Sequence, residues 1–169
     1  MKKYIGIDNG SSGAIASLNQ QGAWKVQRVV RLRVGTHWLL DVEQNIAILQ
    51  QMAEDVGGVG NLIVAYEASR KNDMFGARNN YVNGRNEEFW RVAFSLLKVH
   101  QHTAVDPKTW QSVCLKGIPA GEPKARARQY IGQCCPEAVW LEEMNKAPRE
   151  AFVDAMCVAL WCRNLHLQS

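Results

Sequence analysis

The chain alternates between short apolar runs and longer amphipathic stretches, and the spacing of apolar residues predicts which are strands and which are helices. Three apolar runs follow one another near the start of the chain, and two more come later, separated by helical stretches. The predicted strands are 2–7, 13–18, 24–34, 61–66 and 103–105. The predicted helices are 40–55, 87–98, 123–134 and 148–164, with a short helix around Trp110.

This order of elements predicts an α/β fold. Consecutive strands favour an antiparallel meander, whereas strands separated by helices favour parallel additions. We expect a five-stranded mixed sheet, with three antiparallel strands followed by parallel additions, flanked by helices. At 169 residues the chain has the length of one domain, so residues 1–169 are expected to fold as one unit.

The composition indicates the cellular compartment of the protein. No apolar run is long enough to span a bilayer, and no signal peptide precedes the first strand. The five cysteines are odd in number and include no CxxC, which favours reduced thiols over a zinc site or a disulfide framework. We therefore expect a cytoplasmic protein with no membrane partner.

Acidic residues stand at three positions where the surrounding pattern is apolar. Asp8 ends the first predicted strand before a Gly-rich turn, and Glu67 ends the strand 61–66. Asp154 lies inside an apolar stretch of the last predicted helix. Burying an unpaired carboxylate costs free energy, and a metal ion can offset that cost. The three acids therefore predict one carboxylate cluster that binds a hard cation, Mg²⁺ or Mn²⁺.

Each of these charged residues also has an ordinary structural interpretation when it is taken alone. Asp8 can cap a turn, and Glu67 can pair with a neighbouring basic side chain such as Arg70. Asp154 can pair with a basic residue of its own helix. The metal interpretation depends on all three acids meeting in space.

Basic and aromatic residues occur together in the long polar segment 69–91. The net charge of the chain is +4 although the predicted metal site is acidic, so the excess positive charge lies elsewhere. Basic residues interleaved with aromatics suit contact with the phosphates and bases of a nucleic acid. The alternative is a polar loop with incidental aromatics. The predicted nucleic-acid-binding residues are Arg70, Lys71, Phe75, Arg78, Tyr81 and Arg85 in this segment, with Lys108, Lys116 and Arg126 beyond it.

The predicted helix 87–98 is apolar over a wider arc than one packed face needs. At about 100° per residue the apolar positions cover an arc of about 200°, twice the stripe of an ordinary surface helix. One face can pack on the sheet, while the rest, around Trp90 and Phe94, needs another cover. A second copy of the chain would provide it, which predicts a homodimer with these two residues at its interface. Burial under residues 100–120 or under the last helix is the alternative.

Several short motifs together resemble one known family. The sequence IGIDNG at 5–10 resembles the opening strand of RuvC-type Holliday junction resolvases, which have the ribonuclease H-like fold. The segments 64–67, 106–111 and 153–155 are similar to later motifs of that family, and Lys124 resembles its basic residue near the scissile phosphate. The motifs keep the family's order over nearly the whole chain, which looks most like the shorter, phage-type members.

The resemblance implies a nuclease that resolves four-way junctions in DNA recombination and repair. We expect such a nuclease to act as a homodimer in a bacterial or phage-infected cell. Such enzymes hydrolyse phosphodiesters with two metal ions roughly 3.5–4 Å apart. Asp8 would bridge the ions, and Glu67 and Asp154 would each hold one. Lys124 would stabilise charge on the phosphate in the transition state, although it could also be an ordinary solvated lysine.

Two positions depart from the pattern of the resembled family. Asn9 stands where the family has Pro, and Asn also suits turns. Ala151 stands where the family commonly has His or Asp. Glu150 comes one residue earlier and faces Asp154 on a helix, so it is the candidate fourth metal ligand. A Glu that stabilises the start of its helix is an equally good account.

Other functions fit part of the pattern. The hairpin at 7–13 resembles the phosphate-binding hairpin of sugar kinases and other actin-like ATPases, which need two such domains and a Gly-rich adenosine loop. The only Gly cluster here, at 57–60, lies in a connection before a strand. A nuclease for flaps, forks or RNA–DNA hybrids would use the same metal chemistry as a junction resolvase. A DNA-binding relative without catalysis would not need an intact set of acids.

Overall fold

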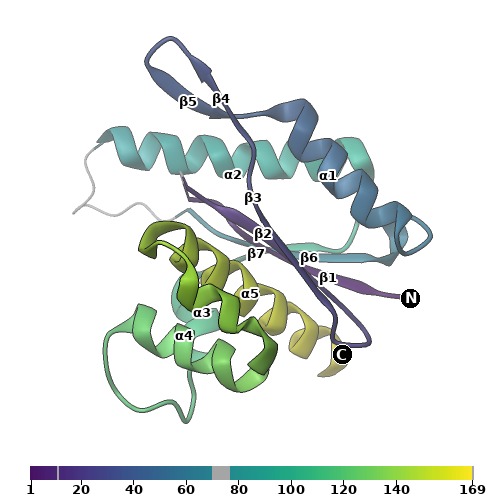
Figure 1. The fold of residues 1–169 in the computed structure, drawn as a ribbon. Coiled ribbons are helices and arrows are strands. Elements are labelled where there is room, and N and C mark those ends of the chain that lie inside the picture. The colour runs from purple at the N-terminus through teal and green to yellow at the C-terminus, as the bar shows by residue number, and fades with distance from the viewer. Residues whose placement is uncertain (11, 70–76, 169) are drawn as a thin grey trace.

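The computed structural model describes residues 1–10, 12–69 and 77–168, and consists of a sheet with helices on both faces and a separate hairpin (Figure 1). The strands are β1 (Lys3–Asp8), β2 (Ala14–Asn19), β3 (Trp24–Arg28), β4 (Arg31–Val34), β5 (His37–Leu40), β6 (Leu62–Glu67) and β7 (His102–Val105). The α-helices are α1 (Val42–Glu54), α2 (Ala77–Leu97), α3 (Pro107–Cys114), α4 (Pro123–Cys134) and α5 (Lys146–Gln168). Two 3₁₀ helices complete the set, η1 (Val59–Asn61) and η2 (Pro136–Glu143).

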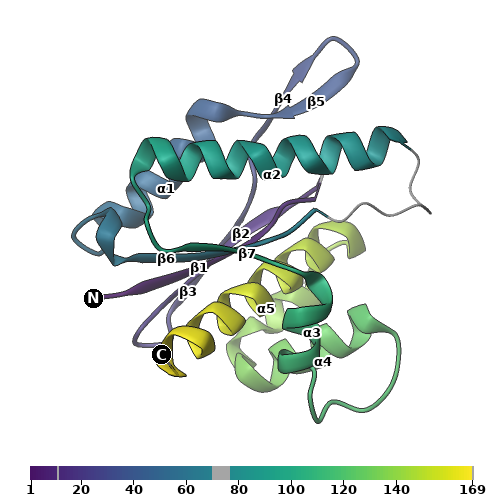
Figure 2. The ribbon, with the colours of Figure 1, turned by 180° about the vertical axis from the view of Figure 1, so that it is seen from behind.

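The main sheet has five strands in the order β3-β2-β1-β6-β7. β1 and β3 each pair antiparallel with β2, while β6 and β7 continue the sheet beyond β1 as parallel strands. The predicted five-stranded mixed sheet is therefore confirmed. Helices α1 and α2 cover one face, and α3, α4 and α5 cover the other (Figures 1 and 2).

Alternation along β1 sends its side chains into two separate cores. Ile5 and Ile7 belong to the core under α1 and α2, whereas Tyr4 belongs to the core under α3, α4 and α5. Helix α5 lies very close to the sheet, and a Cβ on Gly6 would overlap the carbonyl oxygen of Ala155. Glycine is therefore required at this position for α5 to cross the strand that ends in an acidic residue.

The prediction of a single strand over 24–34 is wrong. β3 ends at Arg28, and β4 then forms a hairpin with β5 outside the main sheet. The side chain of Asn45, which is fully buried in α1, accounts for the break: it donates to the carbonyl of Val30 (2.7 Å) and accepts from its N–H (3.0 Å). Both polar groups of Val30 are satisfied by this amide, so the chain can leave the sheet at this point.

Helix α2 begins at residue 77 instead of 87, so part of the predicted polar loop is helical. Trp90 and Phe94 are fully buried in the core between α2 and the sheet. The prediction that they line a dimer interface is wrong, because the chain itself covers both side chains. On the same arc of α2, Val92 and Leu96 are exposed.

The remaining predicted elements are present with small changes in length. Residues 123–134 form α4 as predicted, and 103–105 and 148–164 lie within the slightly longer β7 and α5. The predicted short helix around Trp110 is α3. Across the part of the chain that the structure describes, no helix is both long and apolar enough to cross a membrane.

Candidate active site

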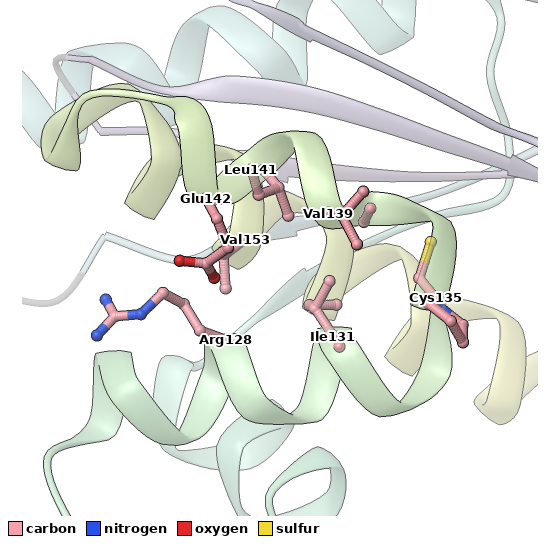
Figure 3. Close-up of a pocket in the computed structure, with 10 residues that line it drawn as sticks. Arg128, Ile131, Cys135, Val139, Leu141, Glu142 and Val153 are labelled. Atoms are coloured by element: carbon pink, nitrogen blue, oxygen red, sulfur yellow. The ribbon is translucent and has the colours of Figure 1, made fainter.

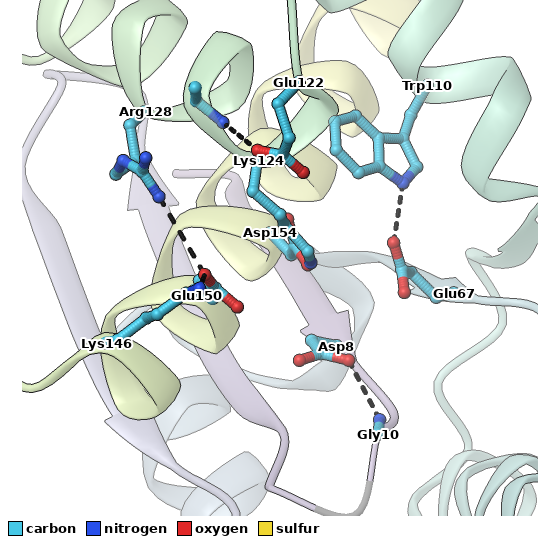
Figure 4. A network of polar contacts seen from close by, with 11 residues as sticks. Asp8, Gly10, Glu67, Trp110, Glu122, Lys124, Arg128, Lys146, Glu150 and Asp154 are labelled. Carbon is cyan, nitrogen blue, oxygen red and sulfur yellow. Dashed lines mark hydrogen bonds and ion pairs between the residues drawn. The ribbon is translucent and has the colours of Figure 1, made fainter.

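Three carboxylates come together at the end of the sheet where β1 and β6 finish (Figure 4). The two strands are parallel neighbours with Ile7 opposite Tyr66, so the next residues, Asp8 and Glu67, lie side by side. Alternation turns both side chains toward α5. Asp154, only 5% exposed, reaches the same place from that helix. The structure therefore brings together the three acids that the sequence singled out.

Burial and mutual repulsion raise the pKa values of these carboxyl groups. Burial, followed by the charge of Asp154, raises the pKa of Asp8 to about 6, against the hydrogen bond from the N–H of Gly10 (2.9 Å). Burial also raises the pKa of Glu67 to about 8, and the charges of Asp8 and Asp154 add to this effect. Each ionised acid thus disfavours ionisation of its neighbours, as expected when carboxylates share one site.

One ammonium group lies within the carboxylate cluster. The Nζ of Lys124, from the first turn of α4, contacts Oδ2 of Asp154. Burial lowers the pKa of Lys124, but the attraction of Asp154 and the other two acids outweighs burial and raises it. Burial raises the pKa of Asp154, and Lys124 opposes that rise. A single lysine among three carboxylates leaves the cluster with excess negative charge when all three are ionised.

The donor chemistry of this cluster fits a divalent cation. Carboxylate oxygens are the ligands that Mg²⁺ and Mn²⁺ prefer, and the cation would relieve the repulsion among the acids. Within residues 1–10, 12–69 and 77–168, no group of three or more Asp, Glu, His or Cys side chains is arranged to hold an ion as the side chains stand. A cation at Asp154 would compete with the ammonium of Lys124 for the same carboxylate.

Side chains that the sequence analysis did not select hold Glu67 and the turn after β1. Trp110 is buried in α3, and its Nε1 donates to Oε1 of Glu67 (2.8 Å). The Nδ2 of Asn9 donates to the backbone carbonyl of Glu67 (2.6 Å), and the Nδ2 of Asn86 donates to that of Asn9 (3.0 Å). Asn9 therefore ties the ends of β1 and β6 together. The only sequence signal for Trp110 is its place in the motif 106–111.

Glu150, the candidate fourth ligand, lies beside the cluster but has other partners (Figure 4). Its Oε1 is 4.0 Å from Nη1 of Arg128 and 3.9 Å from Nζ of Lys146. After burial, which is the main cause, the charge of Glu150 helps to raise the pKa of Asp154. Its role as a metal ligand stays a prediction, and its observed role is in these two ion pairs.

The predicted nucleic-acid-binding residues are spread over several elements. Tyr81 on α2, Lys108 on α3 and Lys116 after α3 are exposed. The guanidinium of Arg85 lies 5.9 Å from the centre of the Tyr81 ring, so a cation and an aromatic face lie together on α2. Outside the described part of the structure lie Arg70, Lys71, Phe75 and the side chain of Arg78.

Arg126 has a structural role within the protein. Its Nη2 donates to the backbone carbonyls of Leu115 (2.9 Å) and Ile118 (3.4 Å). The guanidinium therefore braces the loop between α3 and α4. Its Nη2 is used inside the protein, and the contact of Arg126 with a phosphate stays a prediction.

A hollow between α4 and η2 is separate from the carboxylate cluster (Figure 3). Its lining is mostly apolar and includes Ile131, Val139 and Leu141. Arg128 and Glu142 are its charged members, and none of the three clustered carboxylates lines it. The cluster at the end of the sheet is therefore the candidate active site.

Comparison with solved structures identifies the fold. No protein-family model matches the sequence, and no curated protein matches it. A structure of T. thermophilus RuvC in complex with a Holliday junction substrate is similar over 95% of this chain and 92% of that chain, with a TM-score of 0.59 and 16% identity. The chain has the RuvC fold. A second Thermus thermophilus RuvC structure is similar over 94% and 91% of the two chains, with a TM-score of 0.51 and 18% identity.

The RuvC fold confirms the resemblance at the level of structure, and the position of the Gly cluster 57–60 argues against the ATPase alternative. Lys3 pairs with Leu62 at the opposite end of β1 and β6 from the carboxylates. The Gly cluster 57–60 comes just before β6, so it lies at that far end. It cannot act together with the hairpin that follows Asp8, as an adenosine loop would have to.

Proposed function

We propose that this protein is a metal-dependent, structure-specific endodeoxyribonuclease that cleaves branched DNA, with the Holliday junction as its substrate. The observation that carries the proposal is the convergence of Asp8, Glu67 and Asp154 from β1, β6 and α5. Buried charges without a partner are costly, and this cluster has three acids around one lysine. The RuvC fold, and the junction bound in one RuvC structure, support the substrate class.

The metal ion and the protein side chains would have separate roles in the reaction. Asp8, Glu67 and Asp154 would hold Mg²⁺, for which Mn²⁺ would substitute. When bound, the metal activates a water molecule and stabilises the leaving oxygen. The indole of Trp110 fixes the orientation of Glu67. The ammonium of Lys124 would contact a phosphate oxygen as charge develops there.

A panel of DNA substrates tests the proposed function. Purified protein with Mg²⁺ is incubated with a four-way junction, a flap, a fork, an RNA–DNA hybrid and a linear duplex. We expect the four-way junction to be cleaved fastest. Faster cleavage of a flap, fork or hybrid would support nuclease activity but reject the junction as the preferred substrate. ATP hydrolysis without any DNA cleavage would reject the nuclease altogether.

Resolution of a four-way junction also implies two active sites. Two symmetric incisions require two copies of the site, which a two-fold dimer provides. We infer a homodimer through the apolar surface of α1 and α2, where Val42 and Leu96 are 51% and 67% exposed. Val92 lies on the same surface. Its position beside Leu96 makes the pair Val92→Glu/Leu96→Glu the natural test.

The double variant should give a folded monomer in sedimentation, because two buried charges at the interface would each be costly. Val139→Glu is the matched control, since Val139 is an equally exposed apolar residue on η2 and should keep the dimer. A wild-type protein that stays monomeric at micromolar concentration with junction DNA would contradict the homodimer.

A further inference from the structure

The β4–β5 hairpin and the strand before it carry positive charge that the proposed active site does not use. No acidic residue occurs between Asp8 and Asp41, a stretch that includes four basic residues. Two of the four lie in the hairpin and a third directly precedes it. The four are Lys25, Arg28, Arg31 and Arg33.

The hairpin stands clear of the main sheet and projects past α2 (Figures 1 and 2). Among the described strands, β4 and β5 pair with each other in a two-stranded sheet of their own. Trp38 is 54% exposed, and the guanidinium of Arg31 lies 5.3 Å from the centre of its ring. A cation on an aromatic face forms a flat, positively charged surface.

Two anchors hold this hairpin, which as an isolated two-stranded unit would be marginally stable. The buried amide of Asn45 fixes the backbone at Val30, where the chain leaves the sheet. The Nη2 of Arg85 in α2 donates to the backbone carbonyl of Trp38 on the returning strand (3.2 Å). The exposed surface is therefore held in a defined position.

The hairpin leaves the sheet at the same end as the carboxylates. Arg28, just before the hairpin, pairs across β2 with Ala14, which pairs with Asp8. Residue Asn86, next to the anchoring arginine of α2, donates to the backbone carbonyl of Asn9 in the turn that follows Asp8. The carboxylates face α5, whereas the hairpin projects past α2 on the other face, so a long ligand bound at the active site would reach the hairpin by passing around this end of the sheet.

The charge of the hairpin favours a polyanion over a second copy of the chain. Burial, followed by repulsion from Arg28, lowers the pKa of Arg31, and an anion would relieve that repulsion. A second hairpin of the same sequence would instead bring like charges opposite one another, which is destabilising.

We propose that the β4–β5 hairpin binds the phosphate backbone of a duplex DNA arm that leads into the active site. The inference rests on the proposed function, because that function makes DNA the polyanion. Arg31 and Arg33 provide the phosphate contacts. Such contacts position a protein on DNA without reading its sequence, so they suit an enzyme that recognises branching.

The test compares two variants that lose the same charge. Arg31→Gln/Arg33→Gln changes the hairpin, whereas Lys2→Gln/Lys98→Gln changes the opposite end of the sheet, because Lys2 directly precedes β1 and the exposed Lys98 lies between α2 and the start of β7. Binding to a long-armed four-way junction and to a linear duplex is measured from 50 to 200 mM salt. Loss of two phosphate contacts lowers the logarithmic salt slope by about 1.8. Over this fourfold range the wild type should lose about 12-fold more affinity than the hairpin variant.

The control variant should follow the wild type in both assays. Equal slopes for the wild type and the hairpin variant would overturn the inference. A hairpin variant that becomes monomeric in sedimentation would also overturn it, because the hairpin would then join two copies of the chain. Circular dichroism of both variants verifies that they are folded.

Cleavage separates this inference from the proposed function. With Mg²⁺ and limiting protein, the control variant should cleave junctions at the wild-type rate, whereas the hairpin variant should cleave them more slowly because it binds them more weakly. If the salt slopes differ as expected but the wild type cleaves no junction, the proposed function fails and the hairpin inference stands. A wild-type protein that binds neither DNA probe overturns both.

Discussion

The substitution Glu67→Gln tests two effects of the acidic cluster, its contribution to DNA cleavage and its cost to the stability of the folded protein. Gln keeps the length of the side chain, and its Oε1 can still accept the hydrogen bond from Nε1 of Trp110. The substitution removes the charge that burial, Asp8 and Asp154 all oppose. We therefore expect the variant to lose DNA cleavage and yet to be more stable than the wild type at pH 8 without metal.

The magnitude follows from the pKa of Glu67, which rises from its ordinary value of 4.5 to about 8 in the folded protein. Between these pH values the unfolded chain has released a proton that the folded chain retains, so the free energy of unfolding falls as the pH rises. The stabilising contribution is fully present below pH 4.5 and is lost as the pH rises through 8. At about 1.4 kcal/mol for each pKa unit, ionisation of Glu67 alone should lower the free energy of unfolding by roughly 3.5 kcal/mol between pH 5 and pH 8.

Urea unfolding at pH 5 and pH 8 measures this loss. In EDTA the wild type should lose stability between the two pH values, and Glu67→Gln should lose much less. Added Mg²⁺ should stabilise the wild type at pH 8, because the ion neutralises the cluster, and should stabilise the variant far less. Glu143→Gln, a change at an exposed Glu on η2, should behave like the wild type throughout. Wild-type stability in EDTA that is flat or rises from pH 5 to pH 8 would refute the reasoning.

Two further substitutions test the packing around the cluster. Trp110→Phe removes the hydrogen bond to Glu67, worth about 1.5–3 kcal/mol for a charged acceptor, and should slow junction cleavage about tenfold or more. Trp90→Phe is its control, because the buried Nε1 of Trp90 has no hydrogen-bond partner among the described residues; equal cleavage by both variants would contradict the role of Trp110. Gly6→Ala should strongly lower the melting temperature, since its Cβ would overlap the backbone of α5. Gly132→Ala on α4, where the space is open, should stabilise by roughly 0.5–1 kcal/mol, and similar melting of the two alanine variants would contradict the packing.

Local patterns were sufficient to predict the elements that deliver the acids. Period-two alternation and strand-end positions correctly placed Asp8 and Glu67 at adjacent strand ends, because parallel strands finish at the same edge. The bounds of α4 were correct because its start has local signals. Pro123 occupies the first turn, and the side chain of Glu122 accepts from the N–H of Ala125 (2.8 Å).

The features that could not be predicted depend on contacts between distant segments. The sheet is interrupted at Val30 by the side chain of Asn45, which no local pattern around Val30 reveals. The pairing of Trp110 with Glu67 likewise joins a helix and a strand that are 43 residues apart. The wide apolar arc around Trp90 indicated burial, but the sequence could not distinguish cover by the chain itself from cover by a second copy.

The central claim is that Asp8, Glu67 and Asp154 form one metal centre that cuts branched DNA. Strand-mapped cleavage of a four-way junction by the wild type and by Asp8→Asn tests it most directly. Asn can still accept the hydrogen bond from Gly10, so the variant should fold and bind the junction normally. We predict symmetric nicks in two opposing strands by the wild type with Mg²⁺, none in EDTA, and none by Asp8→Asn. Near-native cleavage by Asp8→Asn, or cleavage by the wild type in EDTA, would contradict the claim.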